Sequence, residues 1–121
     1  MGSLNKQTPG NIPGYVYLLH RDNGQYKIGR SYCPEMRVKE LKYQEGIQGE
    51  LIWTLKCVDM VTTERAFHQR LVQYHVNREF FSLPDDIVDW VCQQTEASVC
   101  EGYDPQRYCR PDGKGYHAST A

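Results

Sequence analysis

The pattern of hydrophobic and polar positions near the N-terminus predicts a β-hairpin. Over residues 14–29 hydrophobic side chains alternate between two faces, and Tyr15 and Tyr17 share one of them. The sequence Asp-Asn-Gly at 22–24 interrupts this alternation, and Asn and Gly tolerate the positive φ angles of tight turns. The second strand then carries a lysine, Lys27, on what should be a half-buried sheet.

The rest of the chain predicts helices and one further strand. The helices are expected from proline or acidic residues in a first turn, and from Gly46 after the end of the first helix. The strand is hydrophobic on both faces, which is typical of a central strand. In chain order, the expected elements are a helix over 31–44, a strand over 50–58, a helix over about 60–74, a short extended piece at 78–81 and a helix that begins at 84.

This order of elements predicts a small α/β (α+β) domain. Its sheet should be mainly antiparallel, with three strands flanked by helices in the order strand, strand, helix, strand, helix, helix. We expect a flexible N-terminal lead over 1–12, the folded domain over 13–96 and an irregular C-terminal tail over 97–121. Tyr103 and Tyr108 are the tail residues expected to fold back on the domain.

Composition supports a single globular domain. The chain has 121 residues, of which 40% are hydrophobic and 24% charged. Neither a membrane-spanning run nor the hydrophobic region of a secretory signal is visible. The five cysteines lack the close spacing of zinc or redox motifs, so we expect reduced thiols in a cytoplasmic protein. A metal site formed by Cys100, Cys109 and His117 is the alternative.

The charge is distributed unevenly along the chain. The formal net charge is −1, but six basic residues stand against three acidic ones between Tyr17 and Lys42. The predicted positive face contains Lys27, Arg30, Arg37 and Lys42. Such a face suits a nucleic-acid backbone, although ordinary solvated charge explains the excess almost as well. The acidic excess after residue 61 leaves a third interpretation open, a protein–protein adaptor.

One carboxylate interrupts a hydrophobic helix face. Met60 and Phe67 belong to the hydrophobic stripe of the helix expected over 60–74, and Glu64 falls between them, with His68 one turn later. A carboxylate on a core-facing stripe is unfavourable unless it is paired or binds a cation. The alternative is an edge position, where Glu64 reaches solvent or pairs with an arginine.

The other candidate residues also have ordinary explanations. Lys27 could extend its amine to water along the sheet, Tyr15 and Tyr17 could pack on the sheet, and Arg37 could be a charge on a helix surface. Together these residues supply a carboxylate for a metal, a guanidinium for a phosphate, and hydroxyl or amine groups that can move a proton. A phosphodiester hydrolase needs these groups.

Over roughly residues 14–84 the sequence resembles the GIY-YIG nuclease superfamily, especially its short single-domain branch of phage and bacterial genomes. Y-V-Y at 15–17 stands where the family has G-I-Y, and K-I-G at 27–29 stands where it has Y-I-G. Arg37, eight residues after the second motif, and Glu64 match the family arginine and the metal-binding glutamate. The chain departs from the pattern at Tyr15, which replaces a glycine, and at Lys27, which replaces a tyrosine.

The resemblance implies an endonuclease that depends on one divalent metal ion, Mg²⁺ or Mn²⁺, and leaves a 5′-phosphate and a 3′-hydroxyl. Glu64 would hold the metal and Arg37 would bind the scissile phosphate. Tyr17 or Lys27 would activate the water, and we expect Lys27, opposite Tyr17 across the hairpin, to have a depressed pKa. Tyr15 and His68 would support the site. We also expect Arg30 and Lys42 to contact the nucleic acid.

A catalytically weak nucleic-acid-binding module of the same fold is the second interpretation. The resemblance favours DNA over RNA as the substrate. It leaves open a homodimer and a partner protein that supplies targeting, because a chain of this size shows no separate specificity domain.

Overall fold

The structure, a computed structural model, describes residues 11–107 and has a five-stranded antiparallel sheet in the order β3-β1-β2-β5-β4. The mixed fold class agrees with the sequence, but the sheet has five strands and not three. The strands are β1 (Gly14–Arg21), β2 (Tyr26–Ser31), β3 (Gly49–Cys57), β4 (His75–Asn77) and β5 (Phe80–Phe81). Of the two additional strands, β5 falls within the short extended piece expected at 78–81, whereas β4, with three residues, is too short for an alternating pattern to reveal.

The first three helices lie close to the positions expected from their sequence signals, whereas the fourth was not expected. The α-helices are α1 (Pro34–Glu45), α2 (Met60–Arg70), α3 (Asp85–Cys92) and α4 (Glu96–Cys100), and the 3₁₀ turns are η2 (Val72–Tyr74) and η3 (Pro105–Arg107). The α-helix expected over 60–74 therefore ends at Arg70 and continues as a 3₁₀ turn. Asp59 caps α2 by accepting hydrogen bonds from the backbone N–H groups of Val61 and Thr62.

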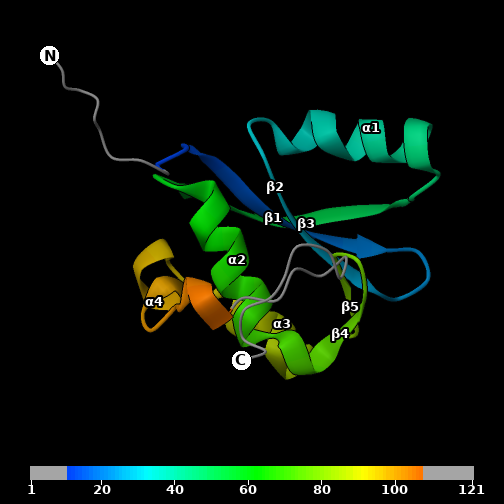
Figure 1. The fold of residues 1–121 in the computed structure, drawn as a ribbon. Helices are drawn as coiled ribbons and strands as arrows, with labels where there is room; N and C mark the ends of the chain where they lie inside the picture. The colour runs from blue at the N-terminus through cyan, green and yellow to red at the C-terminus, as the bar shows by residue number, and fades with distance from the viewer. Residues whose placement is uncertain (1–10, 108–121) are drawn as a thin grey trace, which may run out of the picture.

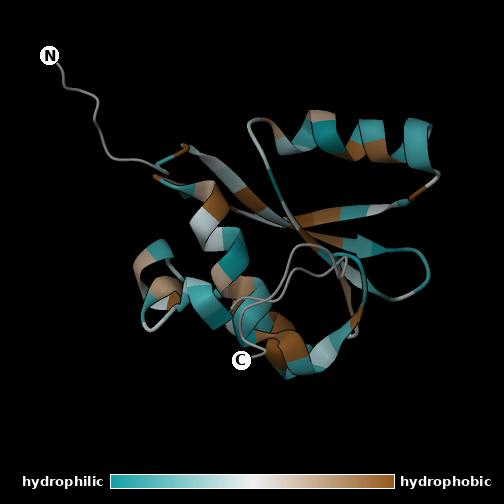
Figure 2. Cartoon of the chain, in the orientation of Figure 1, coloured by the Kyte–Doolittle hydropathy of each residue, from teal (hydrophilic) through white to brown (hydrophobic). Residues whose placement is uncertain are grey.

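The hairpin and the helices on the two faces of the sheet position the candidate site residues. β1 and β2 pair directly, and their turn contains Gly24 at φ 93°, as the sequence predicts. Figure 1 shows α1 on one face of the sheet and α2, α3 and α4 on the other. Figure 2 shows that α1 is largely hydrophilic, and of its residues Leu41 and Pro34 are buried.

Each face of the sheet has its own hydrophobic cluster. On the α1 face the buried cluster consists of Tyr17, Leu19, Leu41, Ile47 and Phe80. On the other face, residues of β1 and β2 pack against α2, α3 and α4 around the fully buried Phe67. Strand β3 lies at an edge of the sheet and alternates between partly buried and exposed positions, so the expectation of a central strand was wrong.

The described part of the C-terminal segment is more ordered than its composition predicts. A capping box formed by Thr95 and Ser98 begins α4, and Val99 of this helix is fully buried against the α2 side of the core. Tyr103 packs on the same core, as expected. The irregular tail predicted from residue 97 is therefore wrong for these residues, because one buried valine stabilises a five-residue helix that has no periodic pattern of its own.

Several sequence expectations lie outside the described residues. These are the lead over residues 1–10, the packing of Tyr108, and two members of the alternative metal site, Cys109 and His117. The four described cysteines are free thiols. No helix between residues 11 and 107 is long and hydrophobic enough to cross a membrane.

Candidate active site

Three of the candidate residues gather on the α1 side of the hairpin. Tyr17 pairs with Gly29 across β1 and β2, and Leu19 pairs with Lys27. Cross-strand partners project to the same face of a sheet, so Tyr17 and Lys27 share the face that α1 covers. The sequence suggested that Lys27 lies directly opposite Tyr17, but Gly29 has that position and Lys27 lies two residue pairs further along the hairpin. Arg37 reaches this face from the first turns of α1.

Lys27 is buried and forms an ion pair. Its side chain is 7% exposed, and its Nζ donates a hydrogen bond to Oε1 of Glu79, which lies between β4 and β5. The same Nζ lies 5.9 Å from the ring centroids of Tyr17 and Phe80. The alternative in which Lys27 extends its amine to water is therefore wrong.

The pKa of Lys27 also differs from the sequence expectation. Burial acts to lower it, but the neighbouring Tyr17 and the hydrogen-bonded Glu79 carboxylate outweigh burial and hold the pKa above its ordinary value. The expected depression was wrong because the sequence did not reveal Glu79 as the partner. Lys27 is an ammonium ion at neutral pH in this state.

Arg37 connects the hydroxyl of Tyr17 to the acidic residues of α1. Burial raises the pKa of Tyr17, against the opposing effects of Lys27 and of a hydrogen bond from Arg37. The guanidinium also contacts two carboxylates of its own helix, with Nη1 3.2 Å from Glu40 and Nη2 3.7 Å from Glu45. Because the Arg37 side chain is 33% exposed, an incoming phosphate could replace these carboxylates.

Glu64 is buried on the α2 side and pairs with Arg30 of β2. Its side chain is 4% exposed, and its Oε1 accepts a hydrogen bond from Arg30 Nη1. Pairing with an arginine was one alternative from the sequence, whereas the solvent-facing edge position was wrong. Burial, and next the Glu79 carboxylate, raise the pKa of Glu64 to about 7, although Arg30 and Lys27 oppose this rise.

His68 lies one turn after Glu64 and is neutral. Its Nε2–H donates to the carbonyl oxygen of Ile28 at 2.8 Å, and the same nitrogen is 3.9 Å from Oε2 of Glu64. Burial lowers the pKa of His68 to about 4. Its Nδ1 is buried without a hydrogen-bond partner. His68 therefore fixes α2 against β2 through the Ile28 carbonyl oxygen, and its ring lies beside the Glu64 carboxylate without a hydrogen bond to it.

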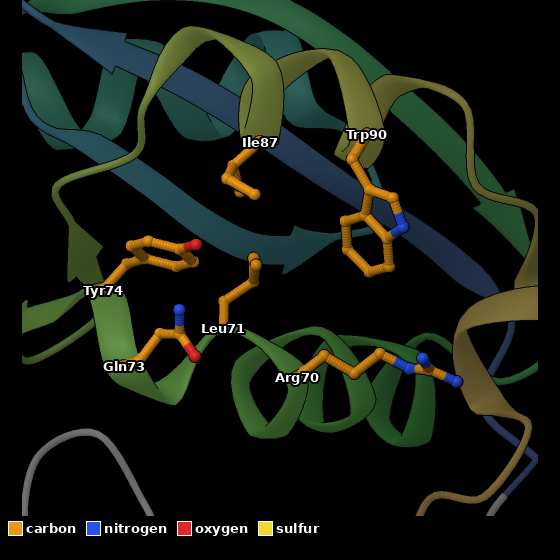
Figure 3. A pocket seen from close by; sticks show the side chains of 6 residues that line it. All are labelled: Arg70, Leu71, Gln73, Tyr74, Ile87 and Trp90. Carbon is orange, nitrogen blue, oxygen red and sulfur yellow. The ribbon is translucent and has the colours of Figure 1, made fainter.

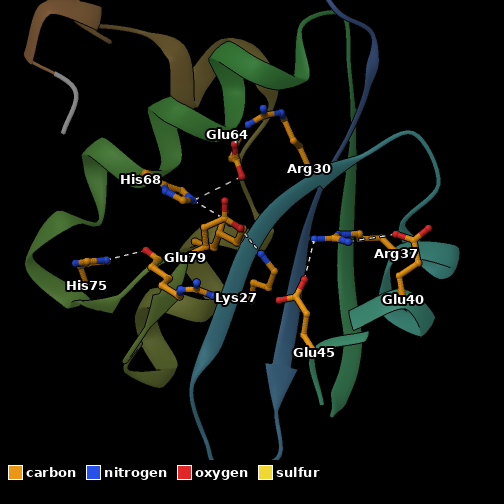
Figure 4. A network of polar contacts seen from close by, with 11 residues as sticks. Lys27, Arg30, Arg37, Glu40, Glu45, Glu64, His68, His75 and Glu79 are labelled. Carbon is orange, nitrogen blue, oxygen red and sulfur yellow. Dashed lines mark hydrogen bonds and ion pairs between the residues drawn. The ribbon is translucent and has the colours of Figure 1, made fainter. Parts of the chain in front are cut away.

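Glu79 connects the two groups of residues, and sequence reasoning missed it. Strand β5 pairs with Tyr26 and Lys27 only, so the edge of β2 is free of a strand partner beyond that point in the described structure. Around this edge Glu79 influences the pKa of both Lys27 and Glu64 (Figure 4). The sequence signal was a carboxylate directly before the hydrophobic pair Phe80–Phe81, but no periodic rule identifies its partner.

Two predicted residues lie apart from this network. Tyr15 is half-buried on β1, in register with Ser31 and Lys56. Lys42 is exposed on α1, and its Nζ lies 5.5 Å from the centroid of the Tyr43 ring. Lys42 remains available to a polyanion, whereas the buried Lys27 is not an ordinary surface contact.

The residues fit a metal ion only as a site with a single protein carboxylate. Residues 11–107 contain no group of three or more His, Cys, Asp or Glu side chains arranged to hold a metal. Oε2 of Glu64 is not the oxygen that Arg30 contacts. Mg²⁺ commonly takes one or two carboxylates and completes its shell with water and substrate phosphate. Glu64 is compatible with that arrangement.

A separate groove lies on the α2–α3 side. It measures about 370 Å³, and its lining residues, shown in Figure 3, are Arg70, Leu71, Gln73, Tyr74, Ile87 and Trp90. None of them belongs to the polar network of Figure 4. Arg70 instead donates hydrogen bonds to carbonyl oxygens at the end of α4, including that of Glu101 at 2.6 Å. The groove is therefore separate from the candidate active site.

Comparison with known proteins places the chain in a family. The T5orf172 domain matches residues 14–96, a range that contains the hairpin, α1, α2 and Glu79. Searches of curated proteins and of solved structures find no significant match. The match covers more than half of the chain and includes every residue of the candidate active site. The chain therefore belongs to the T5orf172 domain family.

Proposed function

We propose that this protein is a divalent-metal-dependent endonuclease of the GIY-YIG type that hydrolyses phosphodiester bonds in nucleic acid, DNA in preference to RNA. The observation that carries the proposal is the gathering of Tyr17, Lys27 and Arg37 on one face, with Glu79 close enough to influence the pKa of both Lys27 and the buried Glu64 of the α2 side. Membership of the T5orf172 domain family is compatible with a nuclease-like or nucleic-acid-binding role and supports the proposal.

In this proposal Glu64 would hold one Mg²⁺ or Mn²⁺. When bound, such an ion neutralises charge on the scissile phosphate and on the leaving oxygen. The raised pKa of Glu64, about 7, means that the carboxylate is available to a cation mainly above neutral pH. His68 lies beside this carboxylate in the next turn of α2.

The remaining residues act directly on the substrate. Arg37 exchanges its carboxylate contacts for a non-bridging phosphate oxygen and stabilises the charge that develops there. Tyr17 accepts a hydrogen bond from the attacking water and orients it. The water oxygen forms a bond to phosphorus as the bond to the 3′-oxygen breaks. The water releases one proton to bulk solvent, and the leaving 3′-oxygen takes up a proton from solvent. The products carry a 5′-phosphate and a 3′-hydroxyl.

A nucleic-acid-binding module without strong catalysis is the second candidate, and one observation favours it. The cationic groups of the candidate active site already have carboxylate partners, with Lys27 on Glu79 and Arg30 on Glu64. The pKa values of Lys27 and Tyr17 are both raised, so both groups are protonated at neutral pH in this state and neither is available to accept a proton.

A plasmid assay separates the two candidates. Supercoiled DNA is incubated with wild type, with Glu64→Gln and with the control Glu50→Gln, in Mg²⁺, Mn²⁺ or EDTA, and binding to the same DNA is measured by mobility shift. An endonuclease nicks the plasmid with Mg²⁺ or Mn²⁺ only, and Glu64→Gln abolishes nicking but not binding. Glu50 is an exposed carboxylate of β3, so its variant should nick like wild type.

Binding without nicking in any metal would support the binding module and contradict the enzyme. The same gel reports on assembly. Direct conversion to linear DNA would indicate that two copies of the chain act together as a homodimer, whereas accumulation of nicked circles would indicate a single cutting unit.

A further inference from the structure

Glu79 is held in place by its backbone. The turn between β4 and β5 places Arg78 at φ 50°, a positive value for a residue other than glycine. His75 Nε2 lies 2.7 Å from the Arg78 carbonyl oxygen, and the Glu79 carbonyl oxygen accepts a hydrogen bond from Ile28 N–H at 3.2 Å. These contacts, seen in part in Figure 4, fix the Glu79 side chain beside β2 at Lys27.

Lys27 and Glu79 differ in how far their side chains are exposed to solvent. The Lys27 side chain is 7% exposed, whereas the Glu79 side chain is 41% exposed. A buried ammonium without a counter-charge is strongly unfavourable, so Lys27 depends on the ion pair more than Glu79 does. One N–H of the ammonium donates to Glu79, and an ammonium has three N–H groups, so donors remain for another acceptor.

We propose that Glu79 is a positioning residue that holds Lys27 as a fixed ammonium on the Tyr17 face of the sheet, so that Lys27 presents positive charge to the scissile phosphate and is not the base. The role of Lys27 toward the scissile phosphate rests on the proposed function. The role of Glu79 in holding Lys27 rests on the ion pair alone.

Charged and titratable groups face Lys27 from three other elements. Tyr17 faces it from β1, Glu79 from the turn between β4 and β5, and Glu64 from α2. Burial lowers the pKa of Lys27 and these three groups raise it, with Tyr17 and Glu79 acting more strongly than Glu64. Removal of the Glu79 charge therefore leaves burial with weaker opposition, and the lysine loses proton affinity.

The direct test measures Lys27 without any substrate. NMR titration of ¹³C-labelled lysine side chains follows Lys27 in wild type, in Glu79→Gln and in the control Glu50→Gln. We expect the proton affinity of Lys27 to fall about ten-fold or more, one pKa unit, in Glu79→Gln. The Glu50→Gln control should leave it unchanged. Glu79→Asp, which keeps the charge on a shorter side chain, should give an intermediate value and serves if Glu79→Gln does not fold.

An unchanged Lys27 titration in both Glu79 variants would overturn the inference. The pH profile of plasmid nicking gives the catalytic readout. Glu79→Gln should lose activity as pH rises, where Lys27 becomes neutral, and Lys27→Arg in the same background should restore activity because arginine stays charged. Faster nicking by Glu79→Gln at high pH would identify Lys27 as the base and contradict the inference. If wild type does not nick at all, the proposed function fails, whereas the NMR titration still decides the role of Glu79.

Discussion

Tyr17 on β1 lies directly opposite Gly29 on β2, and a methyl carbon at position 29 would sit 2.6 Å from the Tyr17 hydroxyl oxygen and 2.7 Å from its Cζ. The tyrosine ring therefore lies over the backbone of Gly29, where a side chain has no space. Tyr17 is 1% exposed, so the ring has little freedom to move away. The glycine of the K-I-G sequence is required here by a close approach and not by its backbone angles.

Gly29→Ala should displace the Tyr17 ring and lower the free energy of unfolding by about 1–3 kcal/mol, the usual cost of overpacking. It should also slow nicking, because Tyr17 would no longer meet Arg37 correctly. Urea unfolding measures the first effect. A double-mutant cycle with Tyr17→Leu provides the control, since leucine lacks the clashing ring atoms and Gly29→Ala should then cost little. Equal costs in both backgrounds would contradict the clash.

Arg37→Ala should leave the fold intact and reduce the nicking rate by roughly 10²-fold or more, as expected for one group that stabilises developing charge. The side chain is partly exposed on α1, so its loss creates no buried cavity. Lys39→Ala is the matched control, because it removes an exposed charge of the same helix. Circular dichroism and a nicking time course are the measurements, and wild-type nicking by Arg37→Ala would remove Arg37 from the site.

Glu64→Gln should stabilise the free protein at alkaline pH. The folded-state pKa of Glu64, about 7, is raised above its ordinary value of 4.5, so its contribution to stability is present below pH 4.5 and is lost as pH rises through 7. A glutamine side chain does not titrate in this range, so its contribution to stability does not depend on pH. We expect the variant to exceed wild type by roughly 1–3 kcal/mol at pH 8 and by much less at pH 5.

Urea unfolding at the two pH values measures this difference. His68 changes stability in the opposite direction, since its depressed pKa removes stability as pH falls from 6.5 towards 4. The unfolding curve of Glu64→Gln at each pH therefore needs to be compared with the wild-type curve at the same pH, because both proteins contain His68. A difference between Glu64→Gln and wild type that does not depend on pH would contradict the raised pKa of Glu64.

Glu64→Gln should also bind DNA more tightly than wild type in EDTA. The Glu64 carboxylate neutralises Arg30 in the free protein, and the variant releases that guanidinium to a phosphate. Each additional phosphate contact steepens the dependence of affinity on salt by about one unit of log–log slope. Fluorescence anisotropy across a salt series tests this, with Glu50→Gln as the control for the general loss of a negative charge. Equal slopes for the three proteins would show that Arg30 does not contact the DNA backbone.

Local sequence signals determined much of the fold. The alternation in β1, the Asp-Asn-Gly turn, the proline in the first turn of α1 and the hydrophobic stripe of α2 each act within a few residues, so their elements were predictable. The presence of Glu64 on that stripe and of Lys27 in a half-buried strand also marked these residues as unusual before any contact was known. The residues Tyr17, Lys27 and Arg37 were named from sequence, and the structure brings them to one face.

Tertiary structure decided the features that depend on contacts distant in sequence. Strands β4 and β5 exist because β2 offers them an edge, and α4 exists because Val99 finds a core to enter. The partner of Lys27 lies 52 residues away in the chain, and the partner of Arg30 lies 34 residues away. The direction of a pKa shift depends on such partners as well as on burial. The sequence therefore identified Lys27 and Glu64 as unusual ionisable residues, whereas only the fold revealed Glu79 and decided that Lys27 is a paired ammonium and Glu64 a weakened acid.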